Sequence, residues 1–180
     1  MSVDVNDPAV SAAARSGDAL GADAFKGVFR RHPAGVAVIT TVVDGKPVGF
    51  TATSVISVSA DPPLLAFSVD SASSAWRALA SAETLVVNFL TAAQVELSAR
   101  FATSGIDRFA TTDWFELPTG EPVLVGSAAW VRGEVLQRTP VGRSFLVSVL
   151  ALESDVATDD ASPLVYHDRS YHGIGDHSVL

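Results

Sequence analysis

The sequence predicts one mainly β domain, folded as an antiparallel barrel with a few short helices. Thirteen glycines and nine prolines separate many short runs of Val, Ile, Leu and Thr, which is typical of strands joined by frequent turns. Helices that could connect parallel strands are too few for a doubly wound fold. The 180 residues, 48% of them hydrophobic, suffice for one buried core but not for a second full domain.

Composition and charge exclude several classes of function. The chain contains no cysteine, which excludes disulfides, thiolate metal sites and cysteine nucleophiles and fits a reducing compartment. Its formal net charge of −8 argues against nucleic acid as a partner. Residues 1–22 lack the basic start and apolar segment of a secretory signal, and the longest uncharged stretch, residues 47–60, is too short to span a bilayer. We therefore expect a cytoplasmic protein with no nucleic-acid or membrane partner.

The chain divides into three parts. Residues 1–22 are rich in Ala, Ser, Asp and Gly without apolar periodicity, which predicts a disordered N-terminal tail. The domain spans residues 23–175, and residues 176–180 form a C-terminal tail. At the start of the domain, Asp23 can cap a short helix that ends before Pro33, because the residue preceding a proline disfavours helical geometry.

Extended runs bounded by turn residues make up most of the domain. The predicted strands are residues 35–43, 47–50, 51–59, 64–69, 84–90, 128–137, 144–152 and 163–172. Asp44-Gly45 is a strong signal for a two-residue hairpin turn, and residues 138–142 are expected to form the turn between the two longest strands. Residues 105–119 are expected to be irregular. The last predicted strand closes the sheet.

Two further helices carry capping signals. Ser73 and Ser74 place a hydroxyl at the N-terminus of a short helix over residues 75–80. Residues 91–94, Thr-Ala-Ala-Gln, match a capping box and open a helix that runs toward Arg100.

No constellation typical of catalysis is present. The sequence lacks a nucleophile–base triad, a phosphate-binding loop and a dinucleotide fingerprint. The four histidines are His32, His167, His172 and His177. The last three recur every five residues, which places neighbours on opposite faces of a strand and does not match the one-turn spacing of a helical metal pair. We therefore predict solvated histidines, no metal site and no catalytic side chain.

The most informative stretch is residues 49–64. Its side chains are small and hydroxylated, so backbone N–H and C=O groups stay accessible to a flat, polar ring. The alternative, which residue chemistry alone favours, is a Thr/Ser-rich strand that pairs within a sheet.

The order and spacing of four segments carry a resemblance. From residues 25–36, through residues 51–64 and 88–90, to residues 163–166, the chain resembles the flavin reductase-like domain family. It is most similar to the short-chain reductase components of two-component flavin-dependent monooxygenases, over about residues 23–175. The resemblance implies an antiparallel split β-barrel of the FMN-binding type. It also implies a homodimer with flavin near the subunit interface, and reduction of FMN or FAD by NADH or NADPH for a transient partner oxygenase.

The resemblance further implies roles for residues at the matching positions. Those that would line the isoalloxazine and ribityl chain, largely through backbone groups, are Thr51, Ala52, Thr53 and Ser54. Those that would approach the ribityl chain and phosphate are Ser68, Asp70, Ser73 and Ser74. Arg100 and Phe101 end a helix where the family often carries a basic residue near the phosphate; the alternative for Arg100 is a cation favoured by the helix dipole. Asn88 either hydrogen-bonds flavin or satisfies a buried backbone group.

One turn departs from the family pattern. Many relatives carry Gly-Asp-His near the nicotinamide, whereas this chain has Gly142, Arg143 and Ser144. The departure leaves the choice between NADH and NADPH open. Two other functions also stay open: a flavin-binding carrier or sensor without turnover, and a split-barrel oxidoreductase whose tightly held flavin acts on its own organic substrate.

Overall fold

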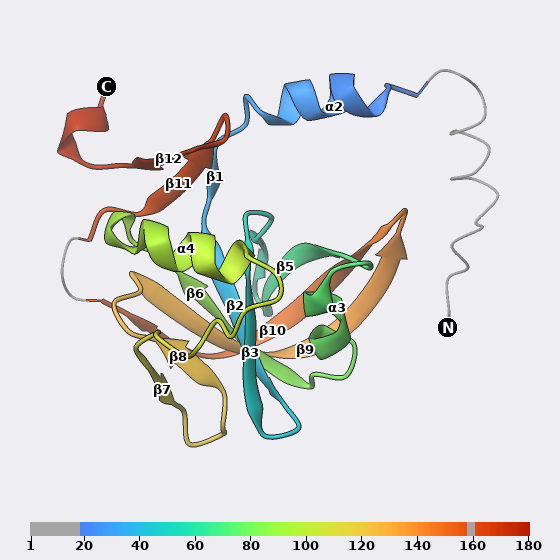
Figure 1. Cartoon of the computed structure of the whole chain (residues 1–180), viewed down its shortest axis with the longest axis vertical. Coiled ribbons are helices and arrows are strands. Elements are labelled where there is room, and N and C mark those ends of the chain that lie inside the picture. Colours follow the sequence, from blue (N-terminus) through green and yellow to red (C-terminus); the bar gives the residue numbers. More distant parts are fainter. Residues whose placement is uncertain (1–18, 158–160) are drawn as a thin grey trace.

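The computed structural model describes residues 19–157 and 161–180 (Figure 1). Its body is a seven-stranded sheet in the order β3-β2-β6-β9-β10-β5-β4, with every neighbouring pair antiparallel. The strands are β2 (Ala37–Val43), β3 (Lys46–Ala52), β4 (Ile56–Ala60), β5 (Pro63–Asp70), β6 (Thr84–Phe89), β9 (Ala129–Val141) and β10 (Ser144–Val156). This arrangement confirms the predicted mainly β, antiparallel architecture.

Smaller elements surround this sheet. The short strands are β1 (Ala34–Gly35), β11 (Leu164–His167) and β12 (Ser170–Gly173), which form a three-stranded sheet, and β7 (Trp114–Glu116) and β8 (Pro122–Leu124), which form a pair. The helices are α2 (Ala22–Phe29), α3 (Ser74–Leu79) and α4 (Val95–Ala102), with 3₁₀ turns at Ala92–Gln94 and Asp176–Ser178.

Strand β2 is covered on both faces. Ala37 and Ile39 point into the main core together with residues of β5, β6 and β10. Val38 points the other way, into a second core that includes Phe101 of α4. Because successive side chains of a strand alternate between faces, β2 can be buried almost throughout only when each face has its own cover.

Several local predictions are confirmed. Asp44 and Gly45 both have positive φ (51° and 72°) and join β2 to β3 as a two-residue turn. Ser73 caps α3, because its hydroxyl accepts a hydrogen bond from the Trp76 amide. The Gln94 side chain accepts from the Thr91 amide, as a capping box requires.

Two predicted boundaries are wrong. The N-cap of α2 is Gly21, with no side-chain cap, so Asp23 lies inside the first turn. The predicted turn at residues 138–142 is also wrong, because β9 continues to Val141 and only Gly142 and Arg143 form the turn. Pairing of β9 with β6 ends at Glu134, so the rest of β9 has β10 as its one strand neighbour, and an edge of this kind tolerates a proline at position 140.

The C-terminal part also differs from the prediction. Residues 163–172 do not form one strand that closes the main sheet; they form the β11–β12 hairpin, which pairs with β1. Its turn consists of Asp168 and Arg169, both with positive φ (45° and 66°), and contains neither glycine nor proline to reveal it in the sequence. The irregular stretch at residues 105–119 contains the short strand β7.

The predicted N-terminal tail lies mostly outside the described residues, which begin at position 19, and so its disorder stays a prediction. The predicted C-terminal tail contains the 3₁₀ turn Asp176–Ser178. Within the two described stretches, no helix combines the length and the apolar character that a membrane span requires.

Candidate functional site

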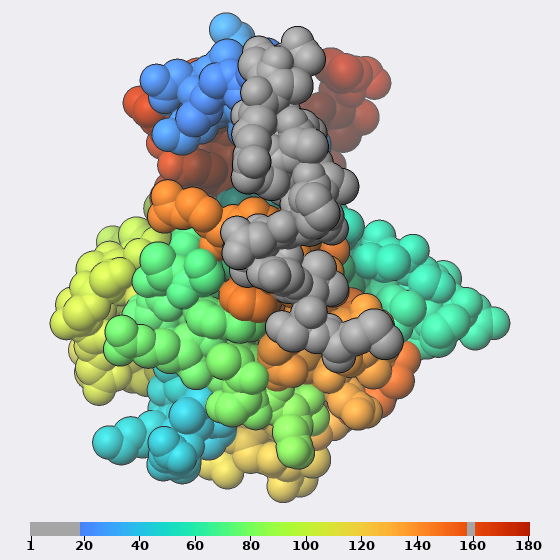
Figure 2. Space-filling model, turned by 90° about the vertical axis from the view of Figure 1, so that its right-hand side faces the viewer, coloured from blue at the N-terminus to red at the C-terminus, as the bar shows by residue number. Residues whose placement is uncertain are grey.

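A cavity of about 810 Å³ lies between the barrel and the elements at its upper end in Figure 1. One wall comes from the β3–β4 connection and β5, and the other from α2, β1 and the β11–β12 hairpin. Figure 2 shows α2, in blue, beside the red C-terminal segment at this end of the molecule. The volume falls in the range of pockets that enclose small molecules and cofactors, about 300–1,000 Å³.

The barrel wall of the cavity is held by hydroxyl groups. Thr53, Ser54 and Ser68 line it. The Ser54 hydroxyl accepts a hydrogen bond from the Ser68 amide (3.0 Å) and donates one to the Ser68 carbonyl (3.1 Å). This pair of bonds fixes the β3–β4 connection against β5. Three of the residues predicted from the sequence, Thr53, Ser54 and Ser68, therefore lie together in this wall.

The base of this wall is anchored below the cavity. The Thr51 hydroxyl donates to the Ser98 carbonyl of α4 at 2.7 Å, and Ala52 is buried. Neither residue lines the cavity. We infer that Thr51 and Ala52 fix the backbone that presents Thr53 and Ser54.

The opposite wall is formed by residues to which sequence reasoning gave no role. Phe29 and Arg30 come from α2 and its C-cap, Tyr166 from β11, and Asp168 and Arg169 from the turn after it. The Asp168 amide donates to the Arg30 carbonyl at 3.2 Å, which joins the turn to the end of α2. The positive φ of Asp168 and Arg169 is the geometry that a two-residue hairpin turn requires.

The charge of the cavity is opposite to that of the chain. Three of its lining residues are cations, Lys26, Arg30 and Arg169, and one is a carboxylate, Asp168. The whole chain carries a formal net charge of −8. Concentrating cations in one concave site favours an anionic ligand.

The remaining predicted residues on β5 and α3 lie beside the cavity. The Asp70 carboxylate accepts from the Ala72 amide within its own turn, and the Ser73 hydroxyl is used as the cap of α3. Ser74 is exposed at the first position of that helix. None of the three lines the cavity.

Asn88 and Phe101 are buried and do not line the cavity. The Asn88 side chain is fully buried and donates to the Val38 carbonyl and the Thr40 hydroxyl, while its oxygen accepts from the Leu124 amide. Of the two roles considered for Asn88, this geometry favours the satisfaction of buried backbone groups. Phe101 is fully buried in the second core.

Arg100 is bound to the segment that follows α4. Its guanidinium donates to the Thr111 carbonyl (2.8 Å) and to the Thr111 hydroxyl, and it does not line the cavity. A neighbouring arginine, Arg108, donates to the carbonyl of Gly49 in β3 (2.6 Å), and burial lowers the pKa of its guanidinium. Arg100 therefore holds the segment after α4 against that helix, and Arg108 holds it against β3.

The turn proposed for nicotinamide binding lies beside the predicted flavin residues. Gly142 has a positive φ of 58°, Arg143 is exposed, and its carbonyl accepts from the Ser71 amide at 3.0 Å. Ser144 pairs with Asp70 in the β5–β10 register. Because side chains two residues apart share a face of a strand, Ser68 and Asp70 connect the cavity wall to this turn.

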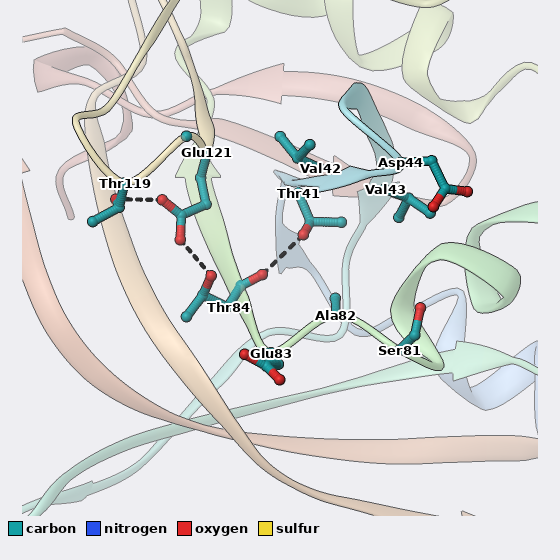
Figure 3. A pocket seen from close by; sticks show the side chains of 11 residues that line it. Thr41, Val42, Val43, Asp44, Ser81, Ala82, Glu83, Thr84, Thr119 and Glu121 are labelled. Atoms are coloured by element: carbon teal, nitrogen blue, oxygen red, sulfur yellow. Dashed lines mark hydrogen bonds between the residues drawn. The ribbon is translucent and has the colours of Figure 1, made fainter.

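A second hollow, of about 360 Å³, lies at the other end of the barrel (Figure 3). Glu121 in its wall is buried and accepts hydrogen bonds from Thr84, Thr119 and Arg132. Burial alone would raise the pKa of Glu121, but these hydrogen bonds outweigh it and lower that pKa to about 2. The described residues contain no cluster of His, Cys, Asp and Glu that fits a metal ion.

Known proteins resemble this chain over most of its length. The model of the flavin reductase like domain matches residues 29–175. An NADH:FMN oxidoreductase of Rhodococcus erythropolis is 43% identical over 169 residues, which cover 92% of this chain and 88% of that protein. The reductase subunit HsaB of a flavin-dependent monooxygenase from Mycobacterium tuberculosis is 34% identical over 151 residues, covering 83% of this chain and 81% of that protein. The crystal structure of a flavin reductase domain protein from Arthrobacter sp. FB24 superposes with a TM-score of 0.80 at 38% identity and covers 87% of this chain and 99% of that one. The chain belongs to the flavin reductase-like domain family.

Proposed function

We propose that the protein is an NAD(P)H:flavin oxidoreductase that binds FMN or FAD in the 810 Å³ cavity and reduces it. One observation carries the proposal: a single cavity joins a hydroxyl-lined wall, suited to a flat polar ring, with a cationic wall, suited to a phosphate. Family membership and the NADH:FMN oxidoreductases among its relatives support the same activity.

A bound flavin supplies the hydride chemistry itself, so the chain has to provide binding, orientation and shielding. The Ser54–Ser68 hydrogen bonds fix the wall against which the ring lies. Phe29 and Tyr166 contribute aromatic surface that limits access of water from the opposite side. This division of labour is consistent with a sequence that contains no acid–base constellation.

The reduced flavin would leave the protein and serve a partner oxygenase. This part of the proposal rests on relatives such as HsaB, which is named as the reductase subunit of a flavin-dependent monooxygenase. A cytoplasmic location follows as an expectation from the absence of cysteine and the cofactors required.

We further propose a homodimer. An apolar hollow of about 340 Å³ lies on the β4–β5 side of the barrel and is lined by Val55, Ile56, Leu64, Phe89 and Val131, among others. Phe25, Val28 and Phe29 of α2 are each more than half exposed. Apolar surface of this extent is typical of a surface covered by another protein, and β4 is an unpaired sheet edge. A stable monomer in light scattering at micromolar concentration would contradict the dimer.

The activity is tested by steady-state oxidation of NADH and NADPH with riboflavin, FMN or FAD added in turn. We expect oxidation that depends on exchangeable flavin. Flavin binding without oxidation of either nucleotide would favour the carrier, and turnover with flavin that does not exchange would favour an oxidoreductase with its own substrate. The same experiment ranks FMN against FAD and NADH against NADPH.

A further inference from the structure

We propose that Ser98 of α4 is a positioning residue that fastens both walls of the 810 Å³ cavity and so sets the space available to the isoalloxazine ring. Its carbonyl holds the barrel wall through Thr51, and its hydroxyl holds the opposite wall through Tyr171. None of these three residues lines the cavity. The inference rests on the proposed function and adds to it a determinant of flavin affinity that lies outside the cavity.

Ser98 is a polar residue at a position where apolar side chains are usual. The buried residues of α4 are Ser98 and Phe101, which lie three positions apart and therefore on one face of the helix. Ser98 is 0% exposed, and serine is a weaker helix former than alanine. A buried hydroxyl is stable only where it has a hydrogen-bond partner. The Tyr171 hydroxyl is that partner, so the polar group at this position has one specific contact to make.

The bond to the barrel wall comes from a helix that packs directly on β3. The Thr51 hydroxyl of β3 donates to the Ser98 carbonyl at 2.7 Å. A second contact lies two residues earlier in β3, where Gly49 leaves room for the Phe101 ring: a Cβ at Gly49 would lie 2.7 Å from a carbon of that ring. Helix α4 therefore contacts β3 at two points, just before residues 53–54, which line the cavity.

The bond to the opposite wall passes through a pair of tyrosines. The hydroxyl groups of Ser98 and Tyr171 lie 3.0 Å apart. Tyr171 of β12 is directly opposite Tyr166 of β11, and their rings meet edge to face, with centroids 5.1 Å apart and planes at 61°. Tyr166 lines the cavity. A displacement of the Tyr171 ring therefore displaces the aromatic surface that faces the ligand.

Because both bonds end on one residue, Ser98 fixes the separation of the two walls. Loss of either bond lets one wall move away from α4, into positions in which the gap is too wide for a flat ring. The apparent affinity then falls in proportion to the fraction of molecules that keep the competent position. Riboflavin and FMN share the ring and ribityl chain, so both should weaken by the same factor.

The test uses Ser98→Ala, Tyr171→Phe and the double variant, each titrated with riboflavin and FMN by quenching of flavin fluorescence, without nicotinamide nucleotide. We expect each variant to bind both flavins about two- to tenfold more weakly, the factor that corresponds to one neutral hydrogen bond. The double variant should bind no more weakly than the single variants, because all three lack the same bond. Thr103→Ala is the matched control: its exposed hydroxyl donates to the carbonyl of Ala99 in α4, away from the cavity, so its removal should leave affinity unchanged.

Thermal melting separates positioning from stability. Tyr171→Phe leaves the Ser98 hydroxyl buried without its partner, which destabilises the fold, whereas the double variant leaves neither hydroxyl and should melt at a higher temperature than Tyr171→Phe. Its flavin affinity should nevertheless stay reduced. Affinity that recovers together with the melting temperature would overturn the proposal, and so would unchanged affinity in all three variants.

Hydrogen exchange tests the same bonds without a flavin. In Ser98→Ala the amides of the β11–β12 hairpin, including that of Asp168, should exchange faster than in the unmutated protein. In Thr51→Val the faster exchange should appear instead at the Ser68 amide, which donates to the Ser54 hydroxyl. If the unmutated protein binds neither flavin, the proposed function fails, and these exchange rates still decide whether Ser98 fastens the two walls. Unchanged exchange in both variants would overturn the proposal.

Discussion

The two ends of the barrel carry hollows of opposite charge, and the polar groups in them are engaged differently. The cavity beneath α2 is lined by three cations, and the guanidinium groups of its two arginines have no partner among the described residues. The hollow at the β2–β3 end contains Glu121, together with Asp44 and Glu83 at its edge. There the buried carboxylate accepts hydrogen bonds from Thr84 and Thr119, which Figure 3 shows, and from Arg132.

The contrast separates a binding site from a structural one. A charged group that is buried and fully hydrogen-bonded stabilises the fold and has no capacity left for a ligand. A charged group on the wall of a cavity that keeps its donors available can bind a ligand. Glu121 therefore joins β8 to β6 and β9, whereas Arg30 and Arg169 face a space of cofactor size.

Removal of the Glu121 side chain is expected to have the largest effect, a loss in the free energy of unfolding. Glu121→Ala leaves Arg132, whose side chain is 14% exposed, without its partner, and an uncompensated buried charge costs about 3–5 kcal/mol. We expect a loss of that size in urea denaturation. The ratio of FMN to riboflavin affinity in the protein that remains folded should not change. Glu116→Ala removes an exposed carboxylate of the neighbouring strand β7 and serves as the control, with little change in stability expected.

The same carboxylate gives a pH dependence. Its pKa is about 2 in the folded protein and 4.5 in the ordinary case, so the folded state binds the proton more weakly than the unfolded chain. The stability that Glu121 contributes is complete above about pH 4.5 and is lost as the pH falls toward 2. At pH 3 the unmutated protein should have lost about 2 kcal/mol more, relative to pH 6, than Glu121→Gln has lost. Parallel loss in both proteins would show that the hydrogen bonds do not hold the charge.

The local elements of the fold could be predicted from the sequence, whereas the contacts that build the two hollows could not. Capping boxes, the Asp44-Gly45 turn and the β-branched runs depend on local chemistry, and they predicted most elements with small boundary errors. The cations that line the cavity, Lys26 and Arg30 on one side and Arg169 on the other, lie about 140 positions apart in the sequence. The turn that contains Arg169 has no glycine or proline, so local patterns do not predict that these residues meet.

The sequence also does not predict the hydrogen bonds around Glu121. Thr84 lies in β6, Arg132 in β9 and Glu121 immediately before β8, and their meeting follows from the register of β6 on β9 and the position of β8. The resemblance placed Thr53, Ser54 and Ser68 in the site, and all three line the cavity. It could not distinguish Arg100, which holds a loop, from Arg30 and Arg169, since the sequence does not show which guanidinium groups donate to backbone carbonyls and which line the cavity.

A smaller effect is expected at the β9–β10 turn, outside both hollows. If Arg143 meets a phosphate of the nicotinamide donor, Arg143→Ala should raise the Michaelis constant for NADH or NADPH roughly tenfold, since one charged contact is lost. Flavin binding by titration should not change, because Arg143 does not line the cavity. Arg77→Ala, which removes an exposed arginine of α3, provides the comparison. An unchanged Michaelis constant in both variants would mean that Arg143 is a solvated turn residue.

The smallest effect is expected from truncation at the N-terminus, and it tests where the cationic site begins. The first 18 residues are rich in Ala, Ser and Asp and show no apolar periodicity, so their removal should leave FMN affinity and reductase rate nearly unchanged. The same holds for removal of residues 1–22, which shortens α2 by a single residue at its start and spares Lys26 and Arg30. Truncation through Arg31 removes both cations of α2 together with Phe29 in the cavity wall, so it should weaken both FMN and riboflavin. If the short truncation already weakens FMN selectively, residues before α2 contribute to the cationic wall of the cavity; if both flavins weaken equally, the N-terminal segment acts on the ring end of the cavity.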